Sequence, residues 1–281
     1  MALSPTALKR RRKFIGSSDV PAILGVSKHQ NIGDVYLAKT GQVEPDTSPN
    51  DAADWGSRME PLLCTWLGER LGVKVRRGQH RASDDGILRA QLDGWIEATN
   101  ETVEAKTSGL LNPYFRADTS GWGADGTDDV PFSVLAQVQF ALLLTRAERG
   151  HVPAFLGGGG GPRHYVIEAL PDLQREIERR CRAFWVEHVI PRVPPTVVPH
   201  LDTLSRVMRE PGKSIEIDHD LIERYQLVRD QKALVDAAAD EARAELVSAL
   251  GDAEEGYTPF GTVTYRANKN GTRALRVKEA P

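Results

Sequence analysis

The sequence predicts an α/β protein in which a central mixed sheet is flanked by helices and followed by a C-terminal helix and β-hairpin extension. Three observations support this prediction. Leu63, Leu67 and Leu71 recur at helical spacing within 52–71. The apolar runs 94–97 and 102–106 flank a turn-prone segment, as the strands of a hairpin do. After a Pro-rich segment, a long helical periodicity begins near Asp218.

Three helices are expected before the first strand. Ser17 or Ser18 offers an N-cap hydroxyl, and Pro21 then lies in the first helical turn, where its missing N–H costs little. Glycines follow the helical patterns, and glycine often ends a helix. The expected helices are 19–24, about 31–41 and 52–71, preceded by a basic arm over residues 1–13.

The middle of the chain alternates strands, loops and helices. Strand structure is expected from Val73 and again within 87–107. Residues 110–129 are rich in Gly and Asp, which favours a mobile surface loop. The five glycines 157–161 are not followed by Gly-Lys-Ser/Thr, so they predict a turn rather than an ATP-binding loop. The remaining expected elements are a helix over 133–144, strands over 151–156 and 165–167, and an amphipathic helix over 173–190.

Residues 191–195 are Pro-rich and predict a domain boundary. Beyond it, a helix over 218–250 and a hairpin joined through Asn270-Gly271 are expected. We therefore divide the chain into a basic arm (1–13), a core domain (14–199) and a C-terminal extension (200–281).

Composition excludes several classes of protein. The formal net charge is −3, so any nucleic-acid contact must come from local basic patches. Cys64 and Cys181 are the only cysteines, too few for a four-thiolate cluster, and their apolar surroundings predict reduced core residues. No apolar segment is long enough for a signal sequence or a membrane span, so a soluble, cytoplasmic protein is expected.

The main chemical signal is Asp93 followed by Glu104-Ala105-Lys106. Side chains alternate along a strand, so Glu104 and Lys106 point the same way, and a hairpin return can bring Asp93 beside them. Hard carboxylate oxygens suit Mg²⁺, and a lysine can orient or deprotonate water or stabilise developing charge. These are the groups that phosphodiester hydrolysis needs. Glu60, on the preceding helix, can approach the same site.

Each of these positions also has a simpler interpretation. A strand with Glu and Lys on one face is more often a solvated sheet surface, and a lone helical Glu is more often exposed. The nearby basic residues Arg76, Arg77, His80 and Arg81 are by default a solvated face, although such a cluster can also grip a DNA backbone. Trp122 can be a stacking wedge for a DNA end or a loop anchor packed on the core.

The wider context resembles the YqaJ-type viral recombinases, the phage lambda exonuclease family of the PD-(D/E)XK nuclease superfamily. The resemblance covers about residues 14–190 and rests on five segments in family order. They are Ile15–Gly25, a Gly-x-x-x-Glu helix within Trp55–Leu62, Leu92–Gly94, Val103–Thr107 and a Gln-containing helix at Ala136–Phe140.

The resemblance implies a role for each matching residue. Asp93, Glu104 and the carbonyl of Ala105 would bind Mg²⁺, for which Mn²⁺ can substitute, and Glu60 would assist a second metal. Lys106 would act on the attacking water, and Gln137 would position that water or Lys106. Ser18 would contact a DNA phosphate. Arg11 falls near the family's phosphate-binding arginine, within a crowded run of basic residues.

By the same resemblance, the expected function is 5′→3′ digestion of double-stranded DNA ends during phage or prophage recombination in a bacterial host. The expected partners are duplex ends, a single-strand annealing protein and further copies of the chain in a ring-shaped trimer, with no membrane. Two alternatives remain open: a restriction- or repair-type endonuclease on the same fold, and a non-catalytic adaptor that binds DNA ends.

Overall fold

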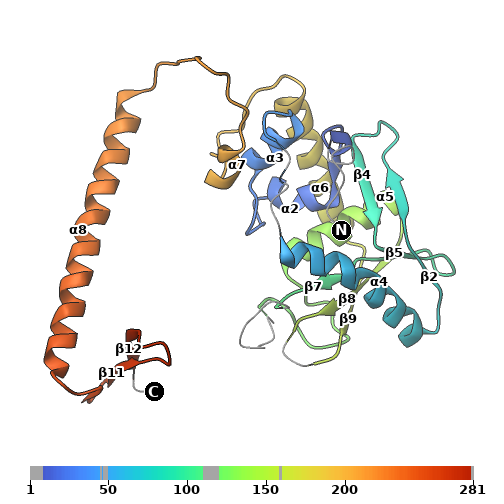
Figure 1. Cartoon of the computed structure of the whole chain (residues 1–281). Helices are drawn as coiled ribbons and strands as arrows, with labels where there is room; N and C mark the ends of the chain where they lie inside the picture. Colours follow the sequence, from blue (N-terminus) through green and yellow to red (C-terminus); the bar gives the residue numbers. More distant parts are fainter. Residues whose placement is uncertain (1–8, 45, 47–49, 110–119, 158–159, 280–281) are drawn as a thin grey trace. The chain divides into compact units, whose positions relative to one another are not determined.

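The computed structural model describes residues 9–44, 46, 50–109, 120–157 and 160–279. The chain forms two compact units, Met1–Arg209 and Glu210–Pro281. The first unit holds two sheets and most of the helices, and the second holds one long helix and a small sheet (Figure 1). No helix in the described part of the chain combines the length and apolarity needed to cross a membrane.

A six-stranded mixed sheet forms the centre of the first unit, in the order β2-β5-β6-β8-β7, with β9 also paired to β8. Strands β6 and β7 are two parts of one line, because Val103 lies opposite His151 and Lys106 lies opposite Ala154 in the same parallel register along β8. The other pairs in the sheet are antiparallel. The strands are β2 (Val75–Arg76), β5 (Gly94–Ile96), β6 (Glu101–Val103), β7 (Lys106–Thr107), β8 (Arg149–Phe155) and β9 (Arg163–Glu168).

A second sheet has three strands, and one of them, β4, is joined directly to a strand of the central sheet. Its order is β1-β4-β3, with β1 (Ile15–Gly16) parallel to β4 (Leu88–Leu92) and β3 (Gln79–Ala82) antiparallel to it. Only Asp93 separates β4 from β5 of the central sheet. The chain therefore passes from one sheet into the other at the predicted site residue.

Helices α4 (Asp51–Leu71) and α5 (Phe132–Thr145) cover opposite faces of the central sheet. Val103 packs with residues of α4, whereas Thr102 points toward Gly150 and α5, as alternating strand side chains must. Helix α5 is apolar on nearly all sides, which matches its burial between layers. The other helices of this unit are η1 (Ser17–Asp19), α2 (Val20–Ile23), α3 (Ile32–Lys39), α6 (Pro171–Phe184), the π-helical turn η2 (Trp185–Val189) and α7 (Leu201–Ser205).

The boundary between the units falls at Arg209, ten residues after the predicted position at 199. Helix α7 packs within the first unit, where Thr203 is buried. The backbone of Val43 forms an antiparallel bridge with Val207 beyond that helix. The Pro-rich segment therefore runs along the first unit rather than linking two units.

The second unit contains α8 (His219–Leu250) and an antiparallel sheet of β10 (Glu255–Thr258), β11 (Gly261–Ala267) and β12 (Arg273–Glu279). The predicted long helix and hairpin are confirmed, and Gly271 in the hairpin turn has a φ of 79°, which glycine adopts without strain. The sequence did not predict β10, which pairs with β11 on its other edge.

Candidate active site

Two breaks in the sheets bring the predicted carboxylates together. Asp93 interrupts the line from β4 to β5, and Glu104-Ala105 interrupts the line from β6 to β7. Because Gly94 pairs with Val103, the two breaks lie side by side. The Ala105 N–H donates a 2.9 Å hydrogen bond to Asp93 Oδ2, which joins the breaks directly. Asp93 and the Glu104-Ala105 segment are thereby placed side by side.

Lys106 connects the acidic strand to helix α5. Its Nζ donates to Glu104 Oε1 at 2.6 Å and to Gln137 Oε1 at 2.8 Å. The Glu104 side chain is 11% exposed and that of Lys106 is 22% exposed, so both groups are largely shielded but reachable from solvent. Asp93, Glu104 and Lys106, expected to converge from the strand pattern, therefore meet Gln137, expected from the family resemblance, in one cluster.

The charged groups of this cluster act on one another's protonation. Burial raises the pKa of the Asp93 carboxyl, and the neighbouring Glu104 raises it further. Burial lowers the pKa of Lys106, but Glu104 and Asp93 raise it by more, so the net shift is upward. Lys106 is therefore an ammonium that donates hydrogen bonds, and it is better suited to orient water or stabilise negative charge than to act as a base.

Glu60 belongs to the same region but is not hydrogen-bonded into the cluster. Burial raises the pKa of its carboxyl, the charge of Arg77 lowers it, and that of Glu104 raises it. Among the described residues, no hydrogen bond or ion pair joins Glu60 to Asp93, Glu104 or Lys106. The electrostatic coupling supports a shared site, and direct ligation by Glu60 stays a prediction.

The donor set suits a hard divalent cation. The charge of Glu104 raises the pKa of the Asp93 carboxyl, and a cation held by both carboxylates would relieve that repulsion. Within the described ranges, no three His, Cys, Asp or Glu side chains lie close enough to hold a metal by themselves. Mg²⁺ does not need three, because it keeps several waters and is bound through one or two carboxylates. Asp93, Glu104 and the Ala105 carbonyl meet that requirement.

The structure brings together the two residues predicted to bind DNA. Arg11 Nη2 donates a hydrogen bond to Ser18 Oγ, and Ser18 is exposed at η1. Arg12, the neighbour that the sequence could not distinguish from Arg11, instead donates to the Val43 carbonyl at 3.2 Å and so holds the fold. Arg11 is therefore the better candidate for a phosphate contact. No contact between described residues joins Arg11 or Ser18 to the acidic cluster.

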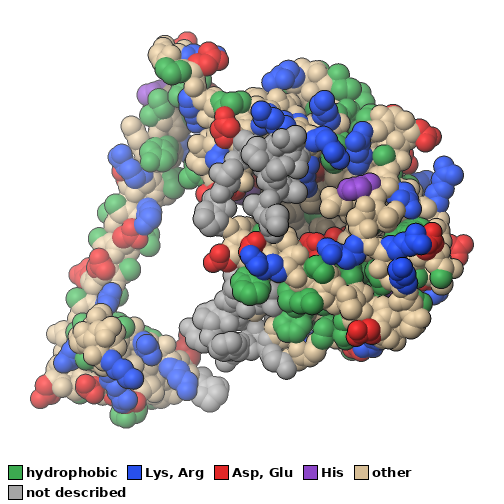
Figure 2. Space-filling view, turned by 45° about the vertical axis from the view of Figure 1, so that its right-hand side comes forward, with side chains coloured by type: hydrophobic (Ala, Val, Ile, Leu, Met, Phe, Trp, Pro, Cys, Tyr) green, Lys and Arg blue, Asp and Glu red, His purple; other side chains and the backbone are tan. Residues whose placement is uncertain are grey.

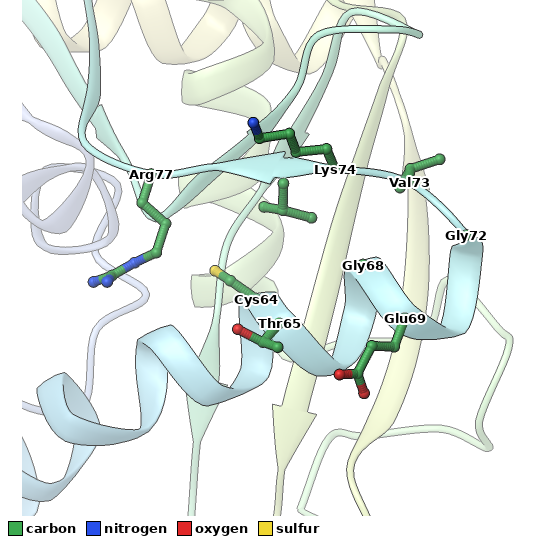
Figure 3. A pocket seen from close by; sticks show the side chains of 9 residues that line it. Cys64, Thr65, Gly68, Glu69, Gly72, Val73, Lys74 and Arg77 are labelled. Atoms are coloured by element: carbon green, nitrogen blue, oxygen red, sulfur yellow. The ribbon is translucent and has the colours of Figure 1, made fainter.

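Sequence reasoning underrated one basic residue next to the site. A groove of about 470 Å³ runs between α4 and β2, and its lining includes Cys64, Thr65 and Arg77 (Figure 3). Cys64 Sγ lies 3.5 Å from the Asp93 carbonyl, so the groove begins beside the acidic cluster. Arg77 points toward α4 in Figure 3, and its charge acts on Glu60. One indication of this role was present in the sequence, because Arg77 directly follows the expected strand that begins at Val73.

Three of the other basic and aromatic candidates, Arg76, Arg81 and Trp122, contact residues of the first unit, and His80 is exposed. Arg76 pairs with Glu97 at 2.7 Å, and the Arg81 guanidinium lies 5.0 Å from the Trp95 ring centre. Trp122 packs against the core with its ring 5.1 Å from that of Tyr165, as expected for a loop anchor rather than a DNA wedge. The first half of the loop expected over 110–129, residues 110–119, lies outside the described residues. Cys64 and Cys181 are free and buried, as predicted.

Comparisons with known proteins identify the family of this chain. Residues 8–148 match the family described as the YqaJ-like viral recombinase domain. The chain is 28% identical over 265 residues to the uncharacterized protein YqaJ of Bacillus subtilis (strain 168), covering 89% of this chain and 79% of that protein.

Solved structures show the same fold. The alkaline exonuclease LHK-Exo from Laribacter hongkongensis superposes with a TM-score of 0.51 at 17% identity, covering 66% of this chain and 92% of that one. LHK-Exo in complex with dAMP superposes with a TM-score of 0.53 at 17% identity, covering 68% and 94%. The predicted fold class, an α/β core with a central mixed sheet flanked by helices, is confirmed.

Proposed function

Because the chain belongs to the family of YqaJ-like viral recombinase domains, we propose that it is a Mg²⁺-dependent deoxyribonuclease that acts in recombination. The observation that carries this proposal is the convergence of Asp93, Glu104, Lys106 and Gln137 at paired breaks in the strands. A merely solvated sheet face would leave these side chains apart and exposed.

Each residue has a distinct part in the proposed reaction. Asp93, Glu104 and the Ala105 carbonyl would hold the metal, and Glu60 would assist a second one. Bound Mg²⁺ supplies Lewis-acid stabilisation of charge developing on the phosphate. The Lys106 ammonium, fixed between Glu104 and Gln137, directs an N–H toward the attacking water or a phosphate oxygen. Preorganisation of this ammonium is the chain's own contribution to the rate.

The finer features of the proposal come from the family. They are 5′→3′ digestion of one strand at duplex ends, cooperation with a single-strand annealing protein, and a ring-shaped trimer. The contact between Arg11 and Ser18 supports a phosphate site near the N-terminus, since a guanidinium and a hydroxyl both donate to phosphate oxygens.

The proposal is tested by digestion of end-labelled linear duplex DNA with Mg²⁺, with Mn²⁺ and with EDTA. We expect metal-dependent release of nucleotides from linear DNA and none from closed, nick-free circles. Asp93→Asn and Lys106→Met should lower the rate at least about a hundredfold. Asp84→Asn, an exposed carboxylate in the turn after β3, serves as the control and should leave the rate unchanged.

Other outcomes would support one of the two alternative functions or another location of the active site. Cleavage of closed circles would indicate an endonuclease, and absence of hydrolysis with either metal would indicate a non-catalytic DNA-end-binding protein. Full activity of Asp93→Asn would place the active site elsewhere. The role of the 5′ end is tested by comparing digestion of duplex ends with and without a 5′-phosphate. We expect the wild type to digest 5′-phosphorylated ends faster. Arg11→Ala should lose this preference, and Arg10→Ala should keep it.

Metal binding can be measured separately from catalysis. In the absence of metal, burial and Glu104 disfavour the charged form of Asp93, so Asp93→Asn should be at least as stable as the wild type. Mg²⁺ should then raise the Tm of the wild type but not that of Asp93→Asn, because only a state that binds metal is stabilised by it. An equal rise in both proteins would remove Asp93 from the metal site.

A further inference from the structure

Arg77 is a basic side chain beside the acidic cluster that forms no ion pair in the described part of the chain. It directly follows β2 and is exposed, and no hydrogen bond joins its side chain to another described residue. Its neighbour Arg76, by contrast, pairs with Glu97 at 2.7 Å. Figure 3 shows Arg77 pointing toward α4, whereas Lys74 points away from that helix. Arg77 is therefore a free guanidinium directed toward α4.

The charge of Arg77 acts on two residues of α4 beside the site. Burial raises the pKa of the Glu60 carboxyl, and Arg77 lowers it more strongly than Lys106 does. Burial also raises the pKa of the Cys64 thiol, as does Asp93, and Arg77 lowers it. Glu60 and Cys64 are four residues apart and therefore share one face of the helix. Because Cys64 Sγ lies 3.5 Å from the Asp93 carbonyl oxygen, a guanidinium near this face is also close to the acidic cluster.

A DNA strand at this site needs cations from the protein as well as a metal. Glu60, Asp93 and Glu104 make the surroundings acidic, and acidic surroundings repel the phosphates of DNA. Bound Mg²⁺ would offset this repulsion at the phosphate that is cleaved, but the phosphates on either side need other partners. A free guanidinium suits them, because it can donate two hydrogen bonds to one phosphate. Figure 2 shows Lys and Arg side chains gathered on one face of the first unit, where a DNA backbone would find further cations.

The groove between α4 and β2 offers space for the nucleotide attached to such a phosphate. Its volume of about 470 Å³ lies within the range of about 300–1,000 Å³ that is typical of small-ligand sites. Thr65 of α4 and Val75 of β2 line its two sides, and a Cβ added at Gly72 would meet no atom within 4 Å, so the groove is open at that end. We propose that Arg77 binds the phosphate next to the one that is cleaved, and that the groove holds the attached nucleotide. This inference rests on the proposed nuclease function.

The phosphate contact is tested with the full chain carrying Asp93→Asn, which should bind labelled duplex DNA without cutting it. Fluorescence anisotropy gives the affinity over a range of salt concentrations. Adding Arg77→Met should weaken binding about tenfold and reduce the slope of log affinity against log salt by about one, because one phosphate contact is lost. Arg77→Lys keeps the charge and should keep the slope. The control Arg146→Met removes an exposed arginine at the end of α5 and should change neither quantity. An unchanged slope for Arg77→Met would overturn the proposal.

The groove is tested by filling it. Thr65→Trp places an indole between α4 and β2 and should weaken DNA binding about tenfold while keeping the salt slope, because Arg77 is still present. The control is Leu62→Trp, a position on α4 outside the groove with 60% exposure. Equal affinities of the two variants would show that no nucleotide enters the groove.

These binding measurements separate this inference from the proposed function. Absence of hydrolysis by the wild type would contradict the nuclease function, whereas a salt slope that depends on Arg77 would still establish the phosphate contact. Hydrolysis by the wild type together with a slope that ignores Arg77→Met would contradict this inference alone.

Discussion

Gln137 is the residue whose function depends most directly on a single contact, the 2.8 Å hydrogen bond that it accepts from Lys106. Gln137→Leu removes the acceptor, so the ammonium loses its fixed direction. We expect kcat for duplex digestion to fall about 10- to 100-fold while KM stays unchanged. Gln137→Glu keeps the acceptor and should retain more activity than Gln137→Leu. Steady-state digestion of labelled duplex separates the two constants.

A general loss of packing would give a different result. If Gln137 only filled space on α5, the Leu variant would keep its kcat and change only its Tm. Equal losses in both variants would also argue against positioning of Lys106, since only one of them lacks the acceptor oxygen.

His164 makes the stability of the first unit depend on pH. Burial, together with the neighbouring His151, lowers the pKa of His164 from 6.5 to about 4. His151 Nδ1 lies 2.8 Å from His164 Nε2, and His151 Nε2 lies 3.0 Å from Glu101 Oε2. A neutral His164 fits this row of hydrogen-bonded side chains. Because the folded protein resists a proton that the unfolded chain accepts, the stability is complete above pH 6.5 and is lost as the pH falls toward 4.

From the size of the pKa shift, His164 lowers the free energy of unfolding by about 3 kcal/mol once the pH has fallen to 4. Urea unfolding at pH 7.5, 6 and 5 should show a falling free energy of unfolding in the wild type. His164→Gln should show a shallower fall, because the group that titrates is gone. Parallel slopes for the two proteins would show that other groups cause the acid sensitivity.

At the scale of elements, the sequence predicted best where one segment alone determines the structure. The spacing of leucines over 52–71 and the hairpin over 94–106 needed no information about distant residues, and α4, β5 and β6 confirm both. The convergence of Asp93, Glu104 and Lys106 followed from strand alternation and the hairpin return. These predictions depend on local geometry, which the sequence encodes directly.

Elements that depend on distant partners were missed. Strand β1 is only Ile15–Gly16 and exists because it pairs with β4, more than seventy residues away. The Lys106–Gln137 contact joins a strand to a helix across 31 positions, and no spacing rule predicts it. Family resemblance supplied Gln137, whereas the groove beside Arg77 had no counterpart in the motifs.

Gly94 allows β2 and β6 to approach β5 closely beside the site. A Cβ at this position would lie 2.5 Å from Val75 Cγ1 and 3.0 Å from Val103 Cβ, in the strands on either side. Gly94→Ala must therefore push β2 or β6 aside, at a cost of about 2 kcal/mol, and should disturb the adjacent Asp93. Gly160→Ala is the control, because no atom lies within 4 Å of its added Cβ. Urea denaturation and nuclease rate should both separate the two variants, and equal behaviour would contradict this steric account.

At the scale of the whole molecule, the buried carboxylate of Asp34 holds the last segment of the first unit against α3. Asp34 is 3% exposed and receives the backbone N–H of His200 at 2.8 Å as well as the His200 ring. Both donors lie beyond residue 199, where the composition predicted the domain boundary. Sequence composition located the Pro-rich segment but could not show that the chain after it returns to α3.

Two truncations compare the predicted boundary with the observed one. Residues 1–209 keep α7 and the donors to Asp34, so this fragment should unfold cooperatively and retain metal-dependent hydrolysis. Residues 1–199 lose both donors and the bridge between Val43 and Val207. Asp34 would keep only the N–H of Asn31 as a donor, and the loss of hydrogen bonds to a buried carboxylate costs about 1–3 kcal/mol, so the shorter fragment should unfold at distinctly lower urea concentration. Equal midpoints would place the end of the folded unit at residue 199.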